Sequence, residues 1–294
     1  MAQANTIKNI AIASPGTGVP IRDRVRSGVT HAILILTSLA IGMPFIWMVT
    51  TALKSRTEVY KFPPVWIPQT LEWQNFVTAW EAAPFAQFYV NSIITTVLGV
   101  VLEVIIALLS AYAFARIEFP KRDLIFMVVL AGMMIPGELT LIPNYVTLSR
   151  LGWINTYQGI VIPHVSSVFG AFLLRQAILG MEKEIFEAAE VDGAGHLRML
   201  FMIAFPMARP VVATLTLFLF IAKWNAYLWP LIVTNSENMR TLPVGLAMVR
   251  EAEYQIGPEH LMAASLFVLL PVLIVFVLAQ KQLIEGIASG AVKG

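Results

Sequence analysis

Six long apolar stretches constrain the fold of this chain more than any other feature of its sequence. Each is close to the roughly 20 residues that an α-helix needs to cross the hydrocarbon core of a bilayer. The composition agrees, because 57% of the 294 residues are hydrophobic and 13% are charged, whereas soluble domains carry about 25% charged residues. We therefore predict an all-α membrane protein with six transmembrane helices. The predicted spans run from about His31 to Leu53, Phe88 to Phe114, Leu124 to Pro143, Tyr157 to Leu179, Val211 to Val233 and His260 to Gln280.

The spans divide the chain into four regions. Residues 1–28 are predicted to be a polar N-terminal tail, and residues 29–87 the first transmembrane helix with the loop that follows it. Residues 88–281 form a core of five helices, and residues 282–294 a C-terminal tail. The first apolar run is too long for a cleavable signal peptide and lacks a clear small-residue cleavage site, so we expect it to be retained. The loop is rich in proline and tryptophan, which suits an ordered segment at the membrane surface.

The distribution of lysine and arginine predicts the orientation of the chain. Six spans place both termini on the same side of the membrane. If that side is the cytoplasm, thirteen of the 20 basic residues lie inside, six lie outside and Lys223 lies within a span. Cytoplasmic loops are enriched in positive charge, so both termini and the segment 181–210 are expected in the cytoplasm.

Two predicted spans contain charged residues. Glu103 lies well inside the second span and Lys223 within the fifth. An ionisable group at such depth usually faces the interior of the helix bundle or water, and finds a partner. Counting inward from the cytoplasmic ends puts both near mid-depth, so a direct ion pair is geometrically possible. The alternative is that each lines a water-filled path or pairs with the backbone.

Prolines interrupt the third span. Ile135-Pro136-Gly137-Glu138 lies in its outer half, and a proline there leaves a backbone carbonyl that only protein or a cavity can satisfy within lipid. Two interpretations remain open at this point: the outer half of the helix, with Glu138, lines a cavity, or the kink serves packing alone.

The charged segment 181–210 lies between two predicted spans. The residues from Glu184 to Glu190 are good helix formers, and Gly193 stands where a helix stop is expected. Asp192 offers an acceptor for the start of the next helix, along which Leu197 and Leu200 recur at helical spacing. We predict two short helices joined by a turn.

Glu187-Ala188-Ala189, Asp192-Gly193-Ala194, Ile203 and Phe205-Pro206 resemble the EAA loop of the permease subunits of bacterial ABC importers. The resemblance implies the type I ABC importer permease fold, in which the first short helix is a coupling helix that docks onto a cytoplasmic ATP-hydrolysing subunit. Small side chains permit close approach, and a glutamate can pair with a basic group of the partner. The alternative is an amphipathic segment on the bilayer surface. The implied coupling residues are Glu187, Ala188, Ala189, Asp192 and Gly193.

A second set of residues resembles the carbohydrate-uptake branch of these permeases. Trp224-Asn225-Ala226-Tyr227-Leu228-Trp229-Pro230 is similar to a run common in that branch, as are Asn91-Ser92 and the tail 286–294. Amide groups beside aromatic rings suit a sugar, although the rings alone would also fit an interfacial belt. The resemblance implies a sugar or sugar-like solute. The candidate pathway residues are Asn91, Glu103, Glu138, Lys223, Asn225 and Tyr227.

Enzymatic function classes find little support in the sequence. There is no phosphate-binding Gly-x-x-x-x-Gly-Lys-Ser/Thr loop, no cysteine, and no metal-binding pattern among the four histidines. We therefore expect no catalytic residue, no cofactor and no metal in this chain, and a net charge of +2 gives no indication of a nucleic-acid partner.

The resemblance implies a set of partners instead. These are a second, different permease subunit, two subunits that bind ATP and Mg²⁺, an extracytoplasmic solute-binding protein and the lipid of a bacterial cytoplasmic membrane. The alternative is an ion-coupled secondary transporter, in which Glu103 would bind a proton or cation and inverted repeats would be expected. A non-transporting scaffold would leave the charges within the spans unexplained.

Overall fold

The computed structural model describes the backbone of residues 21–251 and 253–291, and the side chains of residues 27–250 and 256–280. The predicted N-terminal tail falls largely outside these residues, as do residues 292–294 of the predicted C-terminal tail. Every regular element among the described residues is a helix. The all-α prediction is therefore confirmed.

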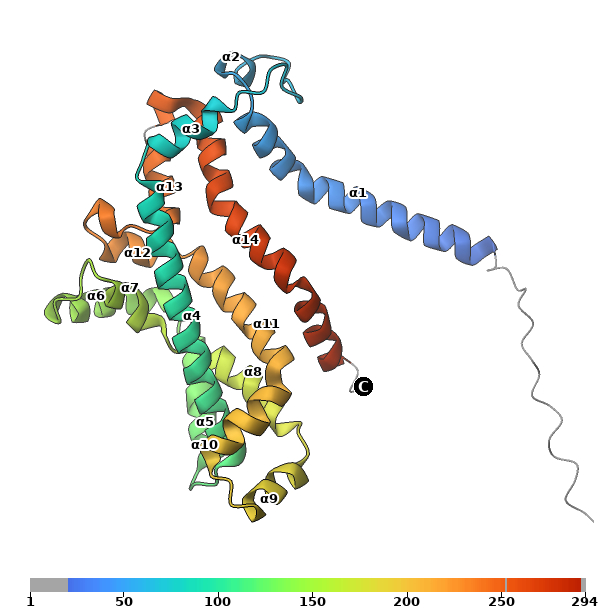
Figure 1. The fold of residues 1–294 in the computed structure, drawn as a ribbon, viewed down its shortest axis with the longest axis vertical. Coiled ribbons are helices and arrows are strands. Elements are labelled where there is room, and N and C mark those ends of the chain that lie inside the picture. The colour runs from blue at the N-terminus through green and yellow to red at the C-terminus, as the bar shows by residue number, and fades with distance from the viewer. Residues whose placement is uncertain (1–20, 252, 292–294) are drawn as a thin grey trace, which may run out of the picture.

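Three long helices form the body of the molecule (Figure 1). They are α4 (Phe85–Arg116), α11 (Phe205–Trp224) and α14 (Glu253–Ala291), and the shorter α8 (Val168–Leu179) packs against α4 and α11. Gly170 of α8 allows this close packing, because a Cβ atom there would lie 3.1 Å from a methyl group of Leu215 and 3.2 Å from Cβ of Ala107. Small residues at helix contacts are typical of packing within membranes.

The structure contains the six predicted apolar segments, but two of them are broken. Among the described residues, four helices are long and apolar enough to cross a membrane, and two bent helix pairs bring the number to six when each pair counts as one span. The first pair, residues 122–134 and 137–150, is bent by 89° at the predicted interruption around Pro136. The second pair, residues 157–164 and 168–179, is bent by 49°, which we did not predict.

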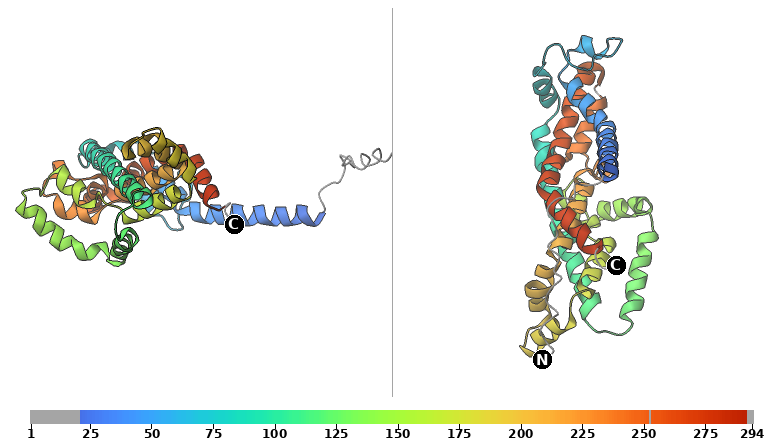
Figure 2. Two further views of the ribbon diagram at one scale, coloured as in Figure 1. Left: turned by 90° about the horizontal axis from the view of Figure 1, so that it is seen from below. Right: turned by 90° about the vertical axis from the view of Figure 1, so that its right-hand side faces the viewer.

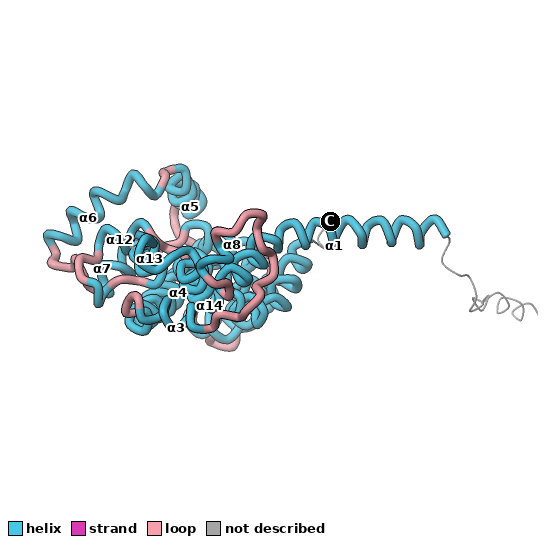
Figure 3. The backbone as a smooth tube through the Cα atoms, turned by 90° about the horizontal axis from the view of Figure 1, so that it is seen from above, coloured by secondary structure: helices cyan, strands magenta, loops and turns pink. Residues whose placement is uncertain are grey.

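Each bent pair consists of several short helices. The first contains α5 (Arg122–Ala131), η1 (Gly132–Met134), η2 (Gly137–Thr140) and α6 (Leu141–Arg150). The second contains α7 (Tyr157–Val161) and η3 (Ile162–His164), followed by α8. Figures 2 and 3 show α5 and α6 standing away from one side of the bundle.

The predicted bounds of the fifth span, Val211 to Val233, are wrong at both ends. The span begins at His196, with α10 (His196–Met199), passes through one π-helical turn (Leu200–Ala204), and ends with α11 at Trp224. Prolines at 206 and 210 lack the N–H that continues a regular helix, and π turns are a common way to absorb such a defect. Residues 228–233 form the separate helix α12 (Leu228–Val233).

The segment 181–210 therefore does not contain two short helices. Only the first helix, α9 (Lys183–Val191), is short, and the second is the start of the fifth span. Gly193 makes the turn between them with a φ of +78°, as its position predicted. A side chain would be strained in this left-handed conformation.

Helix α1 (Ile21–Ala52) stands apart from the other helices. It contacts α14 near its C-terminal end and then runs away from the bundle (Figures 1 and 2). None of its most apolar window is buried within the chain. Asn75 of α3 (Gln74–Glu81) holds the end of α1, because its side-chain amide donates to the carbonyls of Ala52 at 2.9 Å and Lys54 at 2.8 Å.

The loop after α1 is ordered, as its composition predicted. Glu58 of α2 (Arg56–Val59) closes it by accepting hydrogen bonds from the backbone N–H of Gln69 at 2.9 Å and of Ser55 at 3.1 Å. These two donors lower the pKa of Glu58 below its ordinary 4.5, because they stabilise the carboxylate. The position of this loop at a bilayer surface stays a prediction.

The two ends of the bundle differ. Helices α2 and α3 lie at one end and α9 lies at the other, beside the starts of α5 and α10 (Figure 1).

Helices α4 and α11 also contact α14. Pro271 of α14 lacks the N–H that would bond the carbonyl of Phe267. The hydroxyl of Tyr89 donates to that carbonyl instead. The remaining elements are η5 (Glu237–Met239) and α13 (Leu242–Glu251).

Candidate functional site

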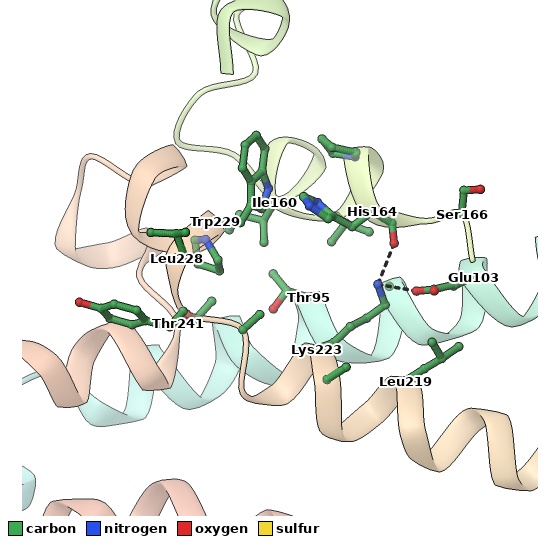
Figure 4. A pocket seen from close by; sticks show the side chains of 17 residues that line it. Thr95, Glu103, Ile160, His164, Ser166, Leu219, Lys223, Leu228, Trp229 and Thr241 are labelled. Atoms are coloured by element: carbon green, nitrogen blue, oxygen red, sulfur yellow. Dashed lines mark hydrogen bonds and ion pairs between the residues drawn. The ribbon is translucent and has the colours of Figure 1, made fainter. Parts of the chain in front are cut away.

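Glu103 and Lys223 form an ion pair in the interior of the bundle (Figure 4). The Nζ atom of Lys223 lies 2.6 Å from Oε2 of Glu103 and donates to the carbonyl of His164 at 2.8 Å. Both side chains are largely buried, with 17% of Lys223 and 8% of Glu103 exposed. The carbonyl belongs to the end of η3, where the break before α8 leaves backbone groups without helical partners. The sequence left open whether Lys223 pairs with Glu103 or with the backbone. In the structure its ammonium makes both contacts.

Gly99 gives Lys223 the room to reach Glu103. A Cβ atom at this position would lie 2.7 Å from Cδ of Lys223, which is closer than a real contact allows. Gly99 and Glu103 are one turn apart on α4, so the lysine crosses the helix over the glycine and meets the carboxylate on the same face. The interaction therefore depends on the absence of a side chain at this one position.

The ion pair lies in the wall of a cavity of about 490 Å³ between α4, η3, α11 and α12. This volume is within the range of small-molecule sites. The lining is mostly apolar, and the hydroxyl of Thr241 is buried without a hydrogen-bond partner among the described residues. The polar and aromatic side chains in the lining are Thr95, Glu103, His164, Ser166, Lys223, Tyr227, Trp229 and Thr241.

Trp229 is held in place on one wall of the cavity. Its indole N–H donates to the carbonyl of Gly159 at 3.2 Å, and its ring centroid lies 5.1 Å from that of His164. Tyr227 is 41% exposed, so its ring remains accessible. The cavity thus offers an aromatic wall, a charged pair and hydroxyl groups within one space.

Asn225 does not line the cavity, although it was a candidate. It lies at the C-terminal end of α11, where its amide donates to the carbonyl of Ile221 at 2.8 Å. That bond helps to satisfy the last turn of the helix. Glu138 also lies elsewhere, on the exposed 3₁₀ turn at the 89° bend between α5 and α6.

Asn91 of α4 connects three segments of the chain, which are α4, α7 and residues 238–240. Its side chain is fully buried and donates to the carbonyls of Asn238 and Arg240, both at 2.8 Å. Its carbonyl oxygen accepts from Tyr157 at 2.7 Å and from Gln87 at 3.0 Å. These four bonds use the full capacity of an amide side chain. Asn91 therefore has no free polar atom for a solute in this structure.

The candidate coupling residues lie together at one end of the bundle, on α9 and the turn after it. Glu187, Ala188 and Asp192 are exposed, and Ala189 is half-buried. The turn closes where the N–H of Ala194 donates to the carbonyl of Ala189 at 2.9 Å. The apolar side chains of Val191 and Leu197 nearby are 88% and 67% exposed, which leaves a small apolar surface around the predicted docking helix.

Some residues of both sites were missed at the sequence level. His164, at the end of η3, and Thr241, in a loop, line the cavity at positions that no local pattern indicates. Arg116 contacts the start of the α9 segment, yet the sequence showed it only as one positive charge at the end of a span. The interruption at Pro136, which was predicted to line a cavity or to serve packing alone, does not line this cavity, whereas Pro163 in the second broken span does.

The apolar helices, with a cavity and a buried charged pair between them, indicate a multi-pass membrane protein. Residues 103–288 match the family described as binding-protein-dependent transport system inner membrane component. This match covers more than half of the chain, and the chain belongs to that family. It is the permease subunit of an ABC importer and not an enzyme, and the ion-coupled alternative is set aside.

Several relatives support this assignment along nearly the whole chain. The diacetylchitobiose uptake system permease protein NgcG of Streptomyces coelicolor is 31% identical over 91% of this chain and 89% of its own. The sn-glycerol-3-phosphate transport system permease protein UgpE of Yersinia enterocolitica is 31% identical over 88% and 95%. The arabinooligosaccharides transport system permease protein AraQ of Halalkalibacterium halodurans is 31% identical over 85% and 91%.

A solved structure shows the same fold. It is the crystal structure of a bacterial ABC transporter involved in the import of the acidic polysaccharide alginate, of which one chain superimposes with a TM-score of 0.77. The identity is 24%, and the match covers 90% of this chain and 99% of that chain. The predicted ABC importer permease fold is confirmed.

Proposed function

We propose that this chain forms half of the translocation path for a carbohydrate or carbohydrate-like solute. The names of the relatives support this solute class, since they refer to diacetylchitobiose, arabinooligosaccharides and sn-glycerol-3-phosphate. A second, different permease subunit would form the other half. Two ATP-binding subunits would hold ATP and Mg²⁺, and an extracytoplasmic binding protein would deliver the solute to the end of the bundle that carries α2 and α3.

The cavity beside the Glu103–Lys223 pair is the observation that carries the proposed path. Sugars combine hydroxyl groups with apolar ring faces, and the cavity combines the Glu103–Lys223 pair with the ring of Trp229. The carboxylate lies 2.6 Å from the ammonium, so the pair adds no net charge to the cavity and offers both a donor and an acceptor group beside it. Tyr227 belongs to the same wall. We propose that Asn91 and Asn225 shape the backbone around the path, and that Glu138 belongs to its outer part.

We propose that α9 couples this path to an ATPase subunit in the cytoplasm. The exposed residues Glu187 and Ala188 would lie in a cleft of that subunit, with Ala189 allowing close approach. Asp192 and Gly193 would fix the turn after the helix. ATP binding would move α9, and the spans would alternate between inward-open and outward-open states. Both termini would then lie in the cytoplasm of a bacterium.

Co-purification tests the coupling role of α9. The chain is expressed with its cognate ATPase and permease subunits, and the amount of ATPase retained per permease is measured. Glu187→Lys should abolish retention while the protein still inserts in the membrane. Glu184→Lys, a charge reversal at another exposed position of the same helix, is the matched control and should retain the ATPase. Full retention by Glu187→Lys and by Gly193→Pro would overturn the assignment of α9.

A further inference from the structure

Arg116 is the last residue of α4 and lies at the end of the bundle that carries α9. It contacts α8 and α9, which follow one another in the chain. Its Nη2 atom donates to the carbonyl of Ile178 at 2.9 Å and to the carbonyl of Met181 at 3.0 Å. Its Cζ atom lies 3.9 Å from the ring centroid of Phe186. One side chain thus joins the end of α4 to the end of α8 and to α9.

The chemistry of these contacts suits arginine. Ile178 lies in the last turn of α8, where the helix carries partial negative charge, and a cation there is favourable. The planar guanidinium can donate to carbonyls and at the same time lie over an aromatic ring, which a lysine ammonium cannot reproduce in one geometry. The contacts of Arg116 therefore depend on the planar geometry of its guanidinium and not on its positive charge alone.

Phe186 is the point at which α9 is attached to the body of the protein. It is 5% exposed and is the one buried residue of α9. Its ring belongs to the main core cluster, together with Tyr112 of α4 and Met199 and Leu200 of the fifth span. On its other side lies the guanidinium of Arg116. The ring of Phe186, together with the partly buried Ala189, is therefore a contact through which a displacement of α9 can act on the bundle.

We infer that Arg116 is a positioning residue for energy coupling, which holds α9, α8 and α4 together so that they move as one body. The inference rests on the proposed docking role of α9. Glu103 lies on the same helix as Arg116, thirteen residues earlier, or about 20 Å at the α-helical rise. A movement received at Phe186 thus reaches the cavity along a single continuous helix, α4.

The cavity itself can report the coupling without knowledge of the solute. The chain contains no cysteine, so a Ser166→Cys variant places one thiol on the cavity wall as a target for N-ethylmaleimide. The rate of labelling of this chain is measured in the assembled complex, without nucleotide and with ATP plus vanadate. We expect the two rates to differ by about fivefold or more, the lower end of typical allosteric couplings.

Substitutions of Arg116 or Phe186 should remove the difference between the labelling rates with and without nucleotide. With Arg116→Gln or Phe186→Leu the ATPase remains bound, and the labelling rate becomes independent of nucleotide. Arg116→Lys should retain an intermediate difference, because it keeps the cation and loses the geometry of the guanidinium. Arg122→Gln, at an arginine whose ion pair is with its sequence neighbour Asp123 at 3.4 Å, is the control and should behave as the unsubstituted protein.

Two results separate failure of this inference from failure of the proposed function. If Glu187→Lys leaves ATPase retention unchanged, the docking role of α9 is wrong. If Glu187→Lys abolishes retention but Arg116→Gln and Phe186→Leu show the full nucleotide-dependent difference, only the role of Arg116 is wrong. Should Arg116→Gln fail to assemble, Arg116→Lys decides alone, and a difference equal to that of the unsubstituted protein contradicts the inference.

Discussion

Lys223 of α11 crosses α4 directly over Gly99, where a Cβ atom would lie 2.7 Å from its Cδ. This contact brings the ammonium to Glu103 and to the carbonyl of His164. Three segments of the bundle are thereby held by one side chain beside the cavity. The arrangement explains how a chain can keep two charges within its spans, because each charge has a partner and both side chains are largely buried.

The first prediction concerns Gly99. Gly99→Ala should displace the lysine and destabilise the protein by about 1–3 kcal/mol, the usual cost of overpacking. Thermal unfolding in detergent measures this as a lower Tm. Gly132→Ala is the matched control, because nothing lies within 4 Å of a Cβ atom there. Equal Tm values for the two variants would show that the packing of Lys223 on Gly99 is unimportant.

The second prediction concerns the ion pair. Removing one partner leaves a buried charge without compensation, so Glu103→Gln and Lys223→Met should each destabilise by about 3–5 kcal/mol. The double variant should lose less than the sum of the two single losses, because no uncompensated charge remains. A double-mutant cycle on thermal unfolding measures the coupling. Strictly additive losses would mean that the two groups do not interact in the membrane.

The third prediction concerns Asn91. Asn91→Asp replaces two donors by acceptors that face the carbonyls of Asn238 and Arg240, and buried groups without partners cost about 1–3 kcal/mol each. The segment around η5 should become sensitive to protease and the Tm should fall. Asn225→Ala, which removes only a helix-end contact, should have a much smaller effect. If the protease pattern of Asn91→Asp is unchanged, Asn91 does not hold the segment around η5 in place.

The fourth prediction is a pH dependence in the loop after α1. The pKa of Glu58 is lower in the folded protein than its ordinary 4.5 because the N–H groups of Gln69 and Ser55 bind the carboxylate. The stabilisation is therefore present above pH 4.5 and is lost as the pH falls through the lowered pKa. Hydrogen exchange at Gln69, corrected for intrinsic rates, should accelerate at the acidic end of this range.

Two variants serve as controls for this pH dependence. Glu58→Gln should exchange faster at neutral pH and show no further acceleration on acidification, since it lacks the titrating group. Glu72→Gln, at another carboxylate near this loop, should follow the unsubstituted protein. Parallel pH profiles for the unsubstituted protein and Glu58→Gln would exclude the role of this carboxylate.

The sequence predicted the parts of the fold that depend on local composition. The apolar segments, the interruption at Pro136 and the turn at Gly193 each follow from a residue type with a strong conformational effect. The end of the fifth span at Trp224 could not be predicted, because hydrophobic residues resume after Asn225 and a run of hydropathy continues across the break. Only the packing of α12 against α6 and α7 distinguishes a separate helix from a longer span.

The candidate site was predictable to a similar degree. A buried Glu103 and a buried Lys223 each require a partner, so their pairing was a reasonable hypothesis. Asn91 was a pathway candidate because Asn91-Ser92 resembles the carbohydrate-uptake branch of these permeases. Its role depends on carbonyls almost 150 residues away. Arg116 was missed for the same reason, since its contacts with Ile178 and Met181 are long-range.

The account depends most on the docking of α9 against an ATPase subunit. A single cysteine at Ala188 in this cysteine-free chain gives the most direct measurement, which is its rate of labelling by a maleimide with and without the bound ATPase. The account predicts strong protection in the complex, while a cysteine at Thr70, at the opposite end of the bundle, labels equally in both samples. Equal labelling at Ala188 with and without the ATPase would contradict it.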